Sequence, residues 1–300
     1  MWRMRGRRIG FLLVAIAIFC AATPPSQARA AARNSLAAKL RTHRTSPTDL
    51  EIGGDVRGLA AGTTRYLTRE DLLAASHAIT ISPDDDNFKT ASKVKAVSLD
   101  ELARALGVPA SDMVIAICKD KYRGHYSRAY RSAHHPVLVM ELDGKPLPGS
   151  PETESDDPGP YMIVHANFKP TFTILAHSDE PQIPWGVVRL EFRDENAVFG
   201  AIAPRGSHAA DVAVQNGFRI AQQNCFRCHN SGAEGGQKSG VTWAVLSAMA
   251  VNAPDFFTGY VRDPKVKSPE AQMPGNPQYD DETLRALTAY FRTSSQVGNP

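Results

Sequence analysis

Residues 225–229 read Cys-Phe-Arg-Cys-His, and this pentapeptide decides how the last third of the 300-residue chain is interpreted. The C-x-x-C-H pattern is the attachment signature of a c-type haem. Two thiols three residues apart lie on one side of a helical turn, where they can add to the two vinyl groups at one edge of a porphyrin. The next residue then falls beneath the iron. The sequence therefore predicts a covalent haem on Cys225 and Cys228, with His229 as an axial ligand.

Two other uses of a C-x-x-C pair fit the surrounding sequence less well. A thioredoxin-like redox pair would follow a strand of a βαβ unit, whereas Cys225 follows a helical stretch, 212–224. A zinc site would need a second pair of Cys or His residues at similar spacing, and none follows.

The flanks of the motif resemble class I cytochromes c over residues 211–296. Gly217-Phe218 lies one helix ahead of the cysteines, where that family has a glycine and an aromatic residue that pack on its last helix. Residues 280–291 begin with acidic side chains and carry apolar residues at helical spacing, as a final helix would. The resemblance implies an all-α cytochrome c fold over residues 211–300.

The second axial ligand is expected to be a methionine, because iron held by His and Met has a raised potential suited to electron transfer. Met273 opens a Met-Pro-Gly loop just before the final helix, at the place where the family has Met-Pro. Met249 is the second choice, since its apolar run predicts core packing. A five-coordinate or water-ligated iron, suited to small-molecule chemistry, is the remaining alternative.

The N-terminus has the three parts of a secretory signal peptide. A basic segment, 1–8, precedes an apolar segment, 9–22, and Ala28-Arg29-Ala30 supplies small residues for cleavage. The apolar segment is short for a membrane span, although an uncleaved anchor is the alternative. We expect residues 1–30 to be removed and the mature protein to be periplasmic or secreted, without a membrane span. Residues 31–48 are polar and basic, and predict a flexible arm.

Charge and cysteine content limit the remaining function classes. The chain has a formal net charge of +3, but the leader holds five arginines and no acid, so the rest of the chain is slightly acidic. No nucleic-acid-binding surface is predicted from this balance. Three cysteines remain after the leader, an odd number, which argues against a disulfide framework.

Residues 49–198 predict an α+β domain with a mixed sheet. Thr68 and Ser98 each begin a helix with a capping-box pattern. Short β-rich runs follow at 113–118, 137–142, 161–165 and 185–192, separated by turn signals. Residues 199–210, with Pro204 and Gly206, predict a linker between the two domains.

This order of elements resembles a short form of the sulfite-oxidase-type molybdopterin-binding fold. Carriers of the resemblance are the opening Ile-Gly-Gly-Asp-Val (52–56), the helix start at 97–102, the Asp-Gly-Lys-Pro-Leu segment at 143–147, and Cys118-Lys-Asp-Lys-Tyr122. In that family a cysteine ligates molybdenum, so the resemblance implies Cys118 as a molybdenum ligand. Lys121 stands where the family has glycine, and most pterin contacts have no counterpart. A buried strand-end thiol is the alternative for Cys118.

The histidines of this domain form no metal-binding pattern. His134 and His135 are expected on a strand, where adjacent side chains point to opposite faces. His125 is the best candidate for a functional histidine if the Cys118 region is a site, because it follows Tyr122 closely.

These observations predict an exported cytochrome that transfers electrons through one covalent haem and docks redox proteins in the periplasm. The first alternative is a molybdenum-pterin oxidoreductase, similar to a sulfite dehydrogenase, with its haem electron acceptor in the same chain. The second is a haem-based sensor or peroxidase. Whether the chain is itself an enzyme stays open, and an electron carrier or electron-transfer subunit is favoured.

Overall fold

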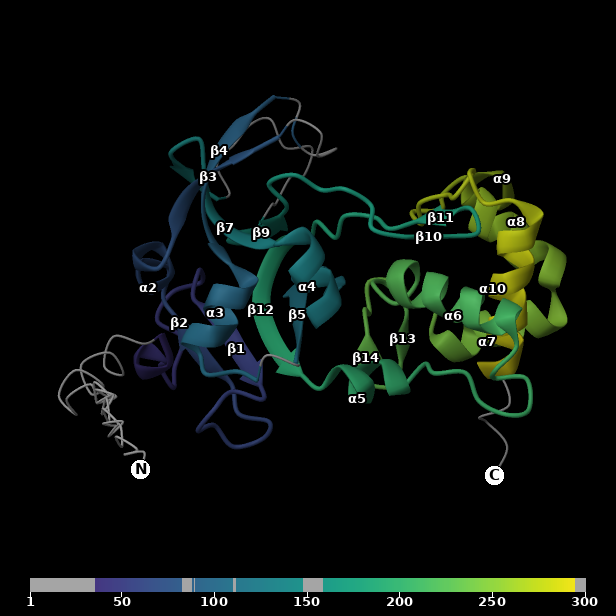
Figure 1. Cartoon of the computed structure of the whole chain (residues 1–300), viewed down its shortest axis with the longest axis horizontal. Coiled ribbons are helices and arrows are strands. Elements are labelled where there is room, and N and C mark those ends of the chain that lie inside the picture. Colours follow the sequence, from purple (N-terminus) through teal and green to yellow (C-terminus); the bar gives the residue numbers. More distant parts are fainter. Residues whose placement is uncertain (1–35, 83–87, 89, 110–111, 148–158, 295–300) are drawn as a thin grey trace, which may run out of the picture.

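The computed structural model describes residues 36–82, 88, 90–109, 112–147 and 159–294, and every structural statement below concerns these residues. A sheet-based domain and a helical domain lie side by side along the long axis of the molecule (Figure 1). The leader, 1–30, lies outside the described residues. No helix among the described residues is long and apolar enough to cross a membrane.

The first domain is built on one mixed sheet. Its ten described strands are β1 (Leu50–Gly54), β2 (Arg65–Leu67), β3 (His77–Ile81), β4 (Ser92–Ser98), β5 (Met113–Cys118), β6 (Arg123–Tyr126), β7 (Val137–Leu142), β8 (Lys145–Pro146), β9 (Tyr161–Val164) and β12 (Trp185–Arg193). The main path runs β2-β1-β12-β9-β7-β4-β3, while β5 pairs with β12 and carries β6 at its free side. Only β1 and β12 pair in parallel, and the other described pairs are antiparallel.

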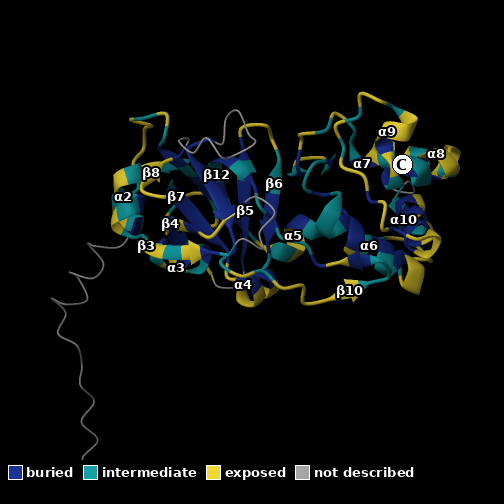
Figure 2. Ribbon diagram, turned by 90° about the horizontal axis from the view of Figure 1, so that it is seen from above, coloured by how far each residue is buried: buried dark blue, intermediate teal, exposed yellow. Residues whose placement is uncertain are grey.

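Short helices cover this sheet, and their starts follow from capping residues. They are α2 (Arg69–Ala74), α3 (Leu99–Ala105) and α4 (Arg128–His134), with a 3-10 turn η1 at Leu36–Lys39. Helix α5 (Glu195–Gly200) follows β12 in the connection between the domains, and its Val198 is buried in the core of the helical domain. The side chains of Thr68 and Ser98 accept hydrogen bonds from the backbone N–H groups of Asp71 and Asp100, as their capping patterns predicted. Figure 2 shows buried strands at the centre of this domain and exposed faces on the helices outside.

Strand β5 is apolar on both faces because each face meets a different core. Val114, Ala116 and Cys118 pack into the core of the first domain. Met113 and Ile115 pack instead with residues of the helical domain. Successive side chains of a strand point to opposite faces, so β5 lies between the cores of the two domains.

The second domain is helical. It comprises α6 (Val212–Asn224), α7 (Trp243–Asn252), α8 (Pro254–Arg262), α9 (Pro264–Lys267) and α10 (Asp281–Ser294), with a small hairpin of β13 (Asn230–Ser231) and β14 (Glu234–Gly235). Helices α6 and α10 cross at Gly217, where an added Cβ would lie 2.1 Å from the carbonyl oxygen of Ala286. The ring of Phe218 lies 5.6 Å from that of Tyr290. The Gly-Phe pair therefore packs on the last helix, as the resemblance implied.

Two connecting segments are more closely packed than the sequence suggested. Residues 36–48, expected as part of a flexible arm, contain η1 with a buried Leu36, and Arg41 pairs with Tyr66 through backbone hydrogen bonds. Within 199–210, expected as a linker, Ile202 is buried in the core of the helical domain. Apolar side chains in these polar stretches bury against the domains and hold both segments in place.

A third segment, between β9 and β12, reaches from the first domain onto the helical domain. It carries the two-residue strands β10 (Thr173–Ile174) and β11 (His177–Ser178), which lie beside the helical domain in Figure 1. Ala176 donates its backbone N–H to the hydroxyl of Thr283 at the start of α10, at 3.0 Å. We call residues 171–182 the bridging arm.

Candidate functional site

The Cys-Phe-Arg-Cys-His motif continues the last turn of α6. Cys225 is the C-cap of this helix, and its N–H donates to Ala221. The N–H groups of Cys228 and His229 both donate to the carbonyl of Cys225, at 3.2 and 3.0 Å. Both thiols are half-buried. The two cysteines and the histidine therefore lie within one hydrogen-bonded turn after α6.

The His229 imidazole is held in the tautomer that a metal ligand needs. Its Nδ1 lies 2.7 Å from the carbonyl oxygen of Val241, so Nδ1 must carry the proton and Nε2 the lone pair. No described residue forms a hydrogen bond with Nε2. Burial lowers the pKa of this histidine, which keeps the ring neutral. A neutral imidazole with its second nitrogen oriented by a carbonyl is the usual form of a histidine ligand.

The two thiols do not have the properties of a thiol–disulfide redox pair. Burial raises the pKa of Cys225 to about 12, with a further contribution from Cys228, and burial also raises the pKa of Cys228. In redox-active C-x-x-C pairs the attacking cysteine has a lowered pKa. The thiols and the oriented imidazole therefore fit a covalently attached haem.

The loop after the motif folds back closely against it. Strands β13 and β14 form a short antiparallel hairpin that reverses the chain after the motif. A Cβ at Gly236 would lie 1.7 Å from the carbonyl oxygen of Arg227, so only glycine allows this contact. The backbone of the motif is therefore fixed from both the helix side and the loop side.

Met273 and Met249 both belong to the helical domain's core region. Each is half-buried and packs, together with Cys225, against the same apolar cluster. Met273 lies in the loop between α9 and α10, and Met249 lies within α7. The choice of Met273 as axial ligand stays a prediction.

The middle residues of the motif contact the first domain. The Phe226 ring is fully buried and stacks on His125 of β6, with ring centroids 4.8 Å apart. The backbone N–H of Arg123 donates to the carbonyl of Arg227 at 3.0 Å, and the Gln237 N–H donates to Lys121 at 2.9 Å. The β5–β6 hairpin thus contacts the backbone that carries the two cysteines.

Ion pairs tie the same two surfaces together. Arg193 of β12 pairs with Glu234 of the β13–β14 hairpin at 2.7 Å, and Asp120 of the β5–β6 turn pairs with Lys238 at 2.7 Å. This junction between the domains was not predictable from the sequence, because the partners lie 41 or more residues apart along the chain and no motif marks them.

Cys118 lies in surroundings that do not fit a molybdenum ligand. Its side chain is 3% exposed and packs in the first domain's apolar core. Burial raises the pKa of its thiol, with a smaller contribution from Asp120. Among the described residues, no group of three His, Cys, Asp or Glu side chains is placed to hold a metal ion. The thiol occupies the position of a small apolar side chain, the alternative raised by the sequence.

The expectation that His134 and His135 lie on a strand is wrong. Ser127 caps α4 by accepting a hydrogen bond from the Tyr130 N–H, and His134 is the last residue of this helix. His135 follows as a left-handed cap with φ 47°. Pro136 cannot continue the helix, so the chain turns there into β7.

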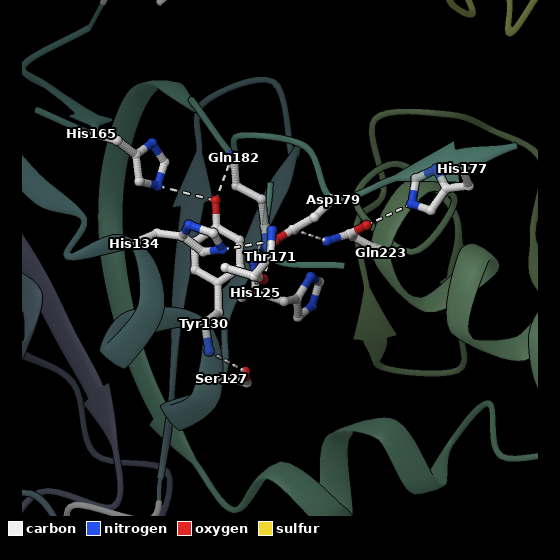
Figure 3. Close-up of polar contacts among 10 residues, drawn as sticks. All are labelled: His125, Ser127, Tyr130, His134, His165, Thr171, His177, Asp179, Gln182 and Gln223. Carbon is white, nitrogen blue, oxygen red and sulfur yellow. Dashed lines mark hydrogen bonds and ion pairs between the residues drawn. The ribbon is translucent and has the colours of Figure 1, made fainter. Parts of the chain in front are cut away.

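His134 belongs to a buried polar network that joins the domains (Figure 3). Its Nε2 lies 2.8 Å from Oδ2 of Asp179, an oxygen that also accepts from the hydroxyl and N–H of Thr171. The other oxygen, Oδ1, accepts from Gln223 of α6 at 2.5 Å. Asp179 of the bridging arm is thus held from both domains, and no sequence pattern marks it because its partners are far apart along the chain.

The network continues toward the haem motif through Gln223. Because the Gln223 amide donates to Asp179, its oxygen accepts from Nε2 of His177, at 2.5 Å. The other nitrogen of His177 accepts from the Tyr279 hydroxyl at 2.7 Å, and that hydroxyl accepts from Asn224, the residue before Cys225. A continuous hydrogen-bonded chain therefore runs from the bridging arm to the start of the motif.

A family model supports the assignment of the helical domain. Residues 212–291 match the model described as cytochrome c oxidase, cbb3-type, subunit III. This region is therefore a c-type cytochrome domain, which implies a haem and a role in electron transfer. The match covers well under half of the chain. A comparison with curated proteins gave no match. The resemblance of residues 49–198 to a sulfite-oxidase-type fold therefore rests on the sequence pattern alone.

Proposed function

We propose that the chain is an exported electron-transfer protein with one haem attached through Cys225 and Cys228. His229 is the first axial ligand and Met273 the second, and the leader, residues 1–30, directs the protein to the periplasm. The observation that carries the proposal is the His229 imidazole, held by Val241 with Nε2 available, one residue after the second cysteine. The haem supplies one-electron redox chemistry, and this chain binds, orients and partly shields it.

In this proposal the first domain covers one side of the haem motif at the junction. The β5–β6 hairpin covers the backbone of the haem motif, and Phe226 is buried against His125. Electron exchange therefore takes place through a part of the haem domain that the first domain leaves accessible. Redox proteins of the same compartment are the proposed partners, and such contacts are typically small and short-lived.

Three measurements on purified holoprotein test the proposal. We expect about one iron per chain without molybdenum, a pyridine haemochrome spectrum typical of two thioether bonds, and a reversible one-electron titration. Molybdenum bound in proportion to the chain would instead favour the fused oxidoreductase. A haem extracted by acid acetone would exclude covalent attachment.

The methionine assignment has its own test. Replacing Met273 with Ala should remove the weak near-infrared band of Met-ligated ferric haem and lower the reduction potential, because a soft thioether ligand favours the ferrous state. Met249→Ala is the matched control and should leave the band in place. Loss of the band in Met249→Ala alone would exchange the roles of the two residues.

A further inference from the structure

A cavity of about 420 Å³ lies at the junction of the two domains, between α4, the bridging arm and α6. Volumes of a few hundred Å³ are typical of pockets for small organic molecules. Neither cysteine of the haem motif lines it, nor does His229. We call it the junction pocket, and nothing in the electron-transfer proposal uses it.

His125 is a buried histidine of the junction pocket whose ring forms no hydrogen bond with any described residue. Its side chain lines the pocket and is 5% exposed, and neither ring nitrogen has a hydrogen-bond partner. Figure 3 shows the contrast: dashed lines reach the rings of His134, His165 and His177, but none reaches the ring of His125. A buried polar group without a hydrogen-bond partner destabilises the folded protein. A pocket that holds such a group is suited to a ligand that supplies the missing hydrogen bonds.

The protonation state of His125 defines what it can bind. Burial, together with the nearby charges of Arg123 and Arg227, lowers its pKa to about 3. The ring is therefore neutral near pH 7 and offers one N–H donor and one acceptor nitrogen. A hydroxyl group can satisfy either nitrogen.

The other side chains of the pocket supply apolar walls and one cation. Phe172, Ile174 and Phe199 line it, and its lining is mostly apolar. Arg219 on the exposed surface of α6 also lines it, and no described residue forms an ion pair with Arg219. The one carboxylate in the lining, Asp179, already accepts four hydrogen bonds from His134, Thr171 and Gln223 and does not compete for Arg219.

We propose that the junction pocket binds a small aromatic acid, with its ring between the apolar walls, its carboxylate at Arg219 and a hydroxyl group at His125. Apolar walls with a few placed polar groups are the usual design of a small-molecule site. Both domains contribute to the pocket, so an occupant contacts α4 and the bridging arm on one side and α6 on the other.

Calorimetric titration of the holoprotein with three probes tests each contact separately. The probes are 4-hydroxybenzoate, benzoate, which lacks the hydroxyl group, and phenol, which lacks the carboxylate. We expect one site per chain, with 4-hydroxybenzoate binding most tightly. Arg219→Gln should weaken 4-hydroxybenzoate and benzoate about tenfold and leave phenol unchanged, since one charged contact is worth roughly that factor.

His125→Phe keeps a ring against Phe226 and removes both nitrogens. It should weaken 4-hydroxybenzoate and phenol and leave benzoate unchanged. Arg128→Gln is the matched control, because Arg128 is an exposed residue of α4 between two lining residues but does not line the pocket. No heat with any of the three probes, or equal weakening by Arg128→Gln and Arg219→Gln, would overturn the proposal. Because Arg219 lies on the surface, its variant remains informative even if His125→Phe does not fold.

Discussion

The cores of the two domains are completed in different ways. The first domain's core is drawn from residues between Leu36 and Phe192 and includes no residue of the helical domain. The cytochrome domain's core includes Met113 and Ile115 from β5 and Val198 and Ile202 from the connection between the domains. A short helical domain buries a smaller fraction of its surface than a large one, and borrowed apolar side chains reduce that deficit. The cytochrome domain therefore depends on side chains from outside the domain to complete its core, whereas the first domain is self-contained.

The largest expected effect is on haem attachment, and it distinguishes Cys225 and Cys228 from the buried Cys118 of the first domain. Replacing Cys225 and Cys228 together with Ala should abolish covalent haem, because no thiol remains at the attachment turn. Cys118→Ala, in the first domain's core, should retain the haem at full occupancy. Haem staining after denaturing electrophoresis measures both. Haem staining in the double variant would contradict the assignment of Cys225 and Cys228 as the attachment residues. Loss of stain in folded Cys118→Ala would mean that haem attachment depends on Cys118.

The next test removes matched apolar groups from each core. Ile115 and Ile163 are both fully buried, the first in the cytochrome core and the second in the first domain's core. Each change to Ala should lower the free energy of unfolding by about 2–5 kcal/mol, through lost burial and the remaining cavity.

The two variants should differ in where the structure opens. Ile115→Ala should raise hydrogen exchange in α6 and α10 although it lies on a strand of the first domain, whereas Ile163→Ala should not. Equal exchange of α6 and α10 in both variants would mean that the cytochrome domain does not depend on β5.

Local signals explain why much of this architecture was predictable. The helix at Val212–Asn224 and the strands at Met113–Cys118 and Val137–Leu142 end where their sequence patterns end. Capping residues and apolar periodicity act within a few residues, and so does the C-x-x-C-H spacing. These signals define elements and the haem site without knowledge of the tertiary structure.

The junction was not predictable, because its contacts join distant segments. Asp179 meets His134 and Gln223 across 45 and 44 residues, and no pattern in the sequence pairs them. The apolar run at 113–118 predicted a strand, but not which core each of its faces would meet. The strand prediction for His134 fails because Ser127 caps a helix that extends to this residue.

Acid should destabilise the first domain and the junction through buried neutral histidines. Burial lowers the pKa of His165, in the first domain, and of His125, at the junction, to about 3. In the unfolded chain each histidine titrates near 6.5, so the unfolded state binds more protons as the pH falls from 6.5 toward 3. Each therefore lowers stability at pH 5, relative to pH 7.5, by roughly 1–2 kcal/mol.

Urea unfolding at the two pH values measures this loss. His165→Gln should reduce the difference between pH 7.5 and pH 5. An undiminished difference in His165→Gln would mean that this ring is not kept neutral by the fold.

The smallest expected effect on stability concerns two residues with a left-handed backbone, one at the junction and one inside the first domain. Lys121, in the β5–β6 turn against the cytochrome domain, has φ 70°, and His135, after α4, has φ 47°. A left-handed backbone costs a residue with a Cβ roughly 1–2 kcal/mol, and glycine avoids this cost at some loss of chain entropy. Lys121→Gly and His135→Gly should each raise the free energy of unfolding by about 0.5–1 kcal/mol.

Urea titration of the holoprotein checks both variants. Lys121 accepts the backbone N–H of Gln237 across the junction, whereas His135 donates its own N–H only to Arg131 of α4. Stabilisation by His135→Gly but not by Lys121→Gly would therefore show that the cytochrome domain, rather than the local turn, dictates the conformation at Lys121. In that case the junction supplies the energy that holds the turn, and the first domain is less self-contained at β5–β6 than its core suggests.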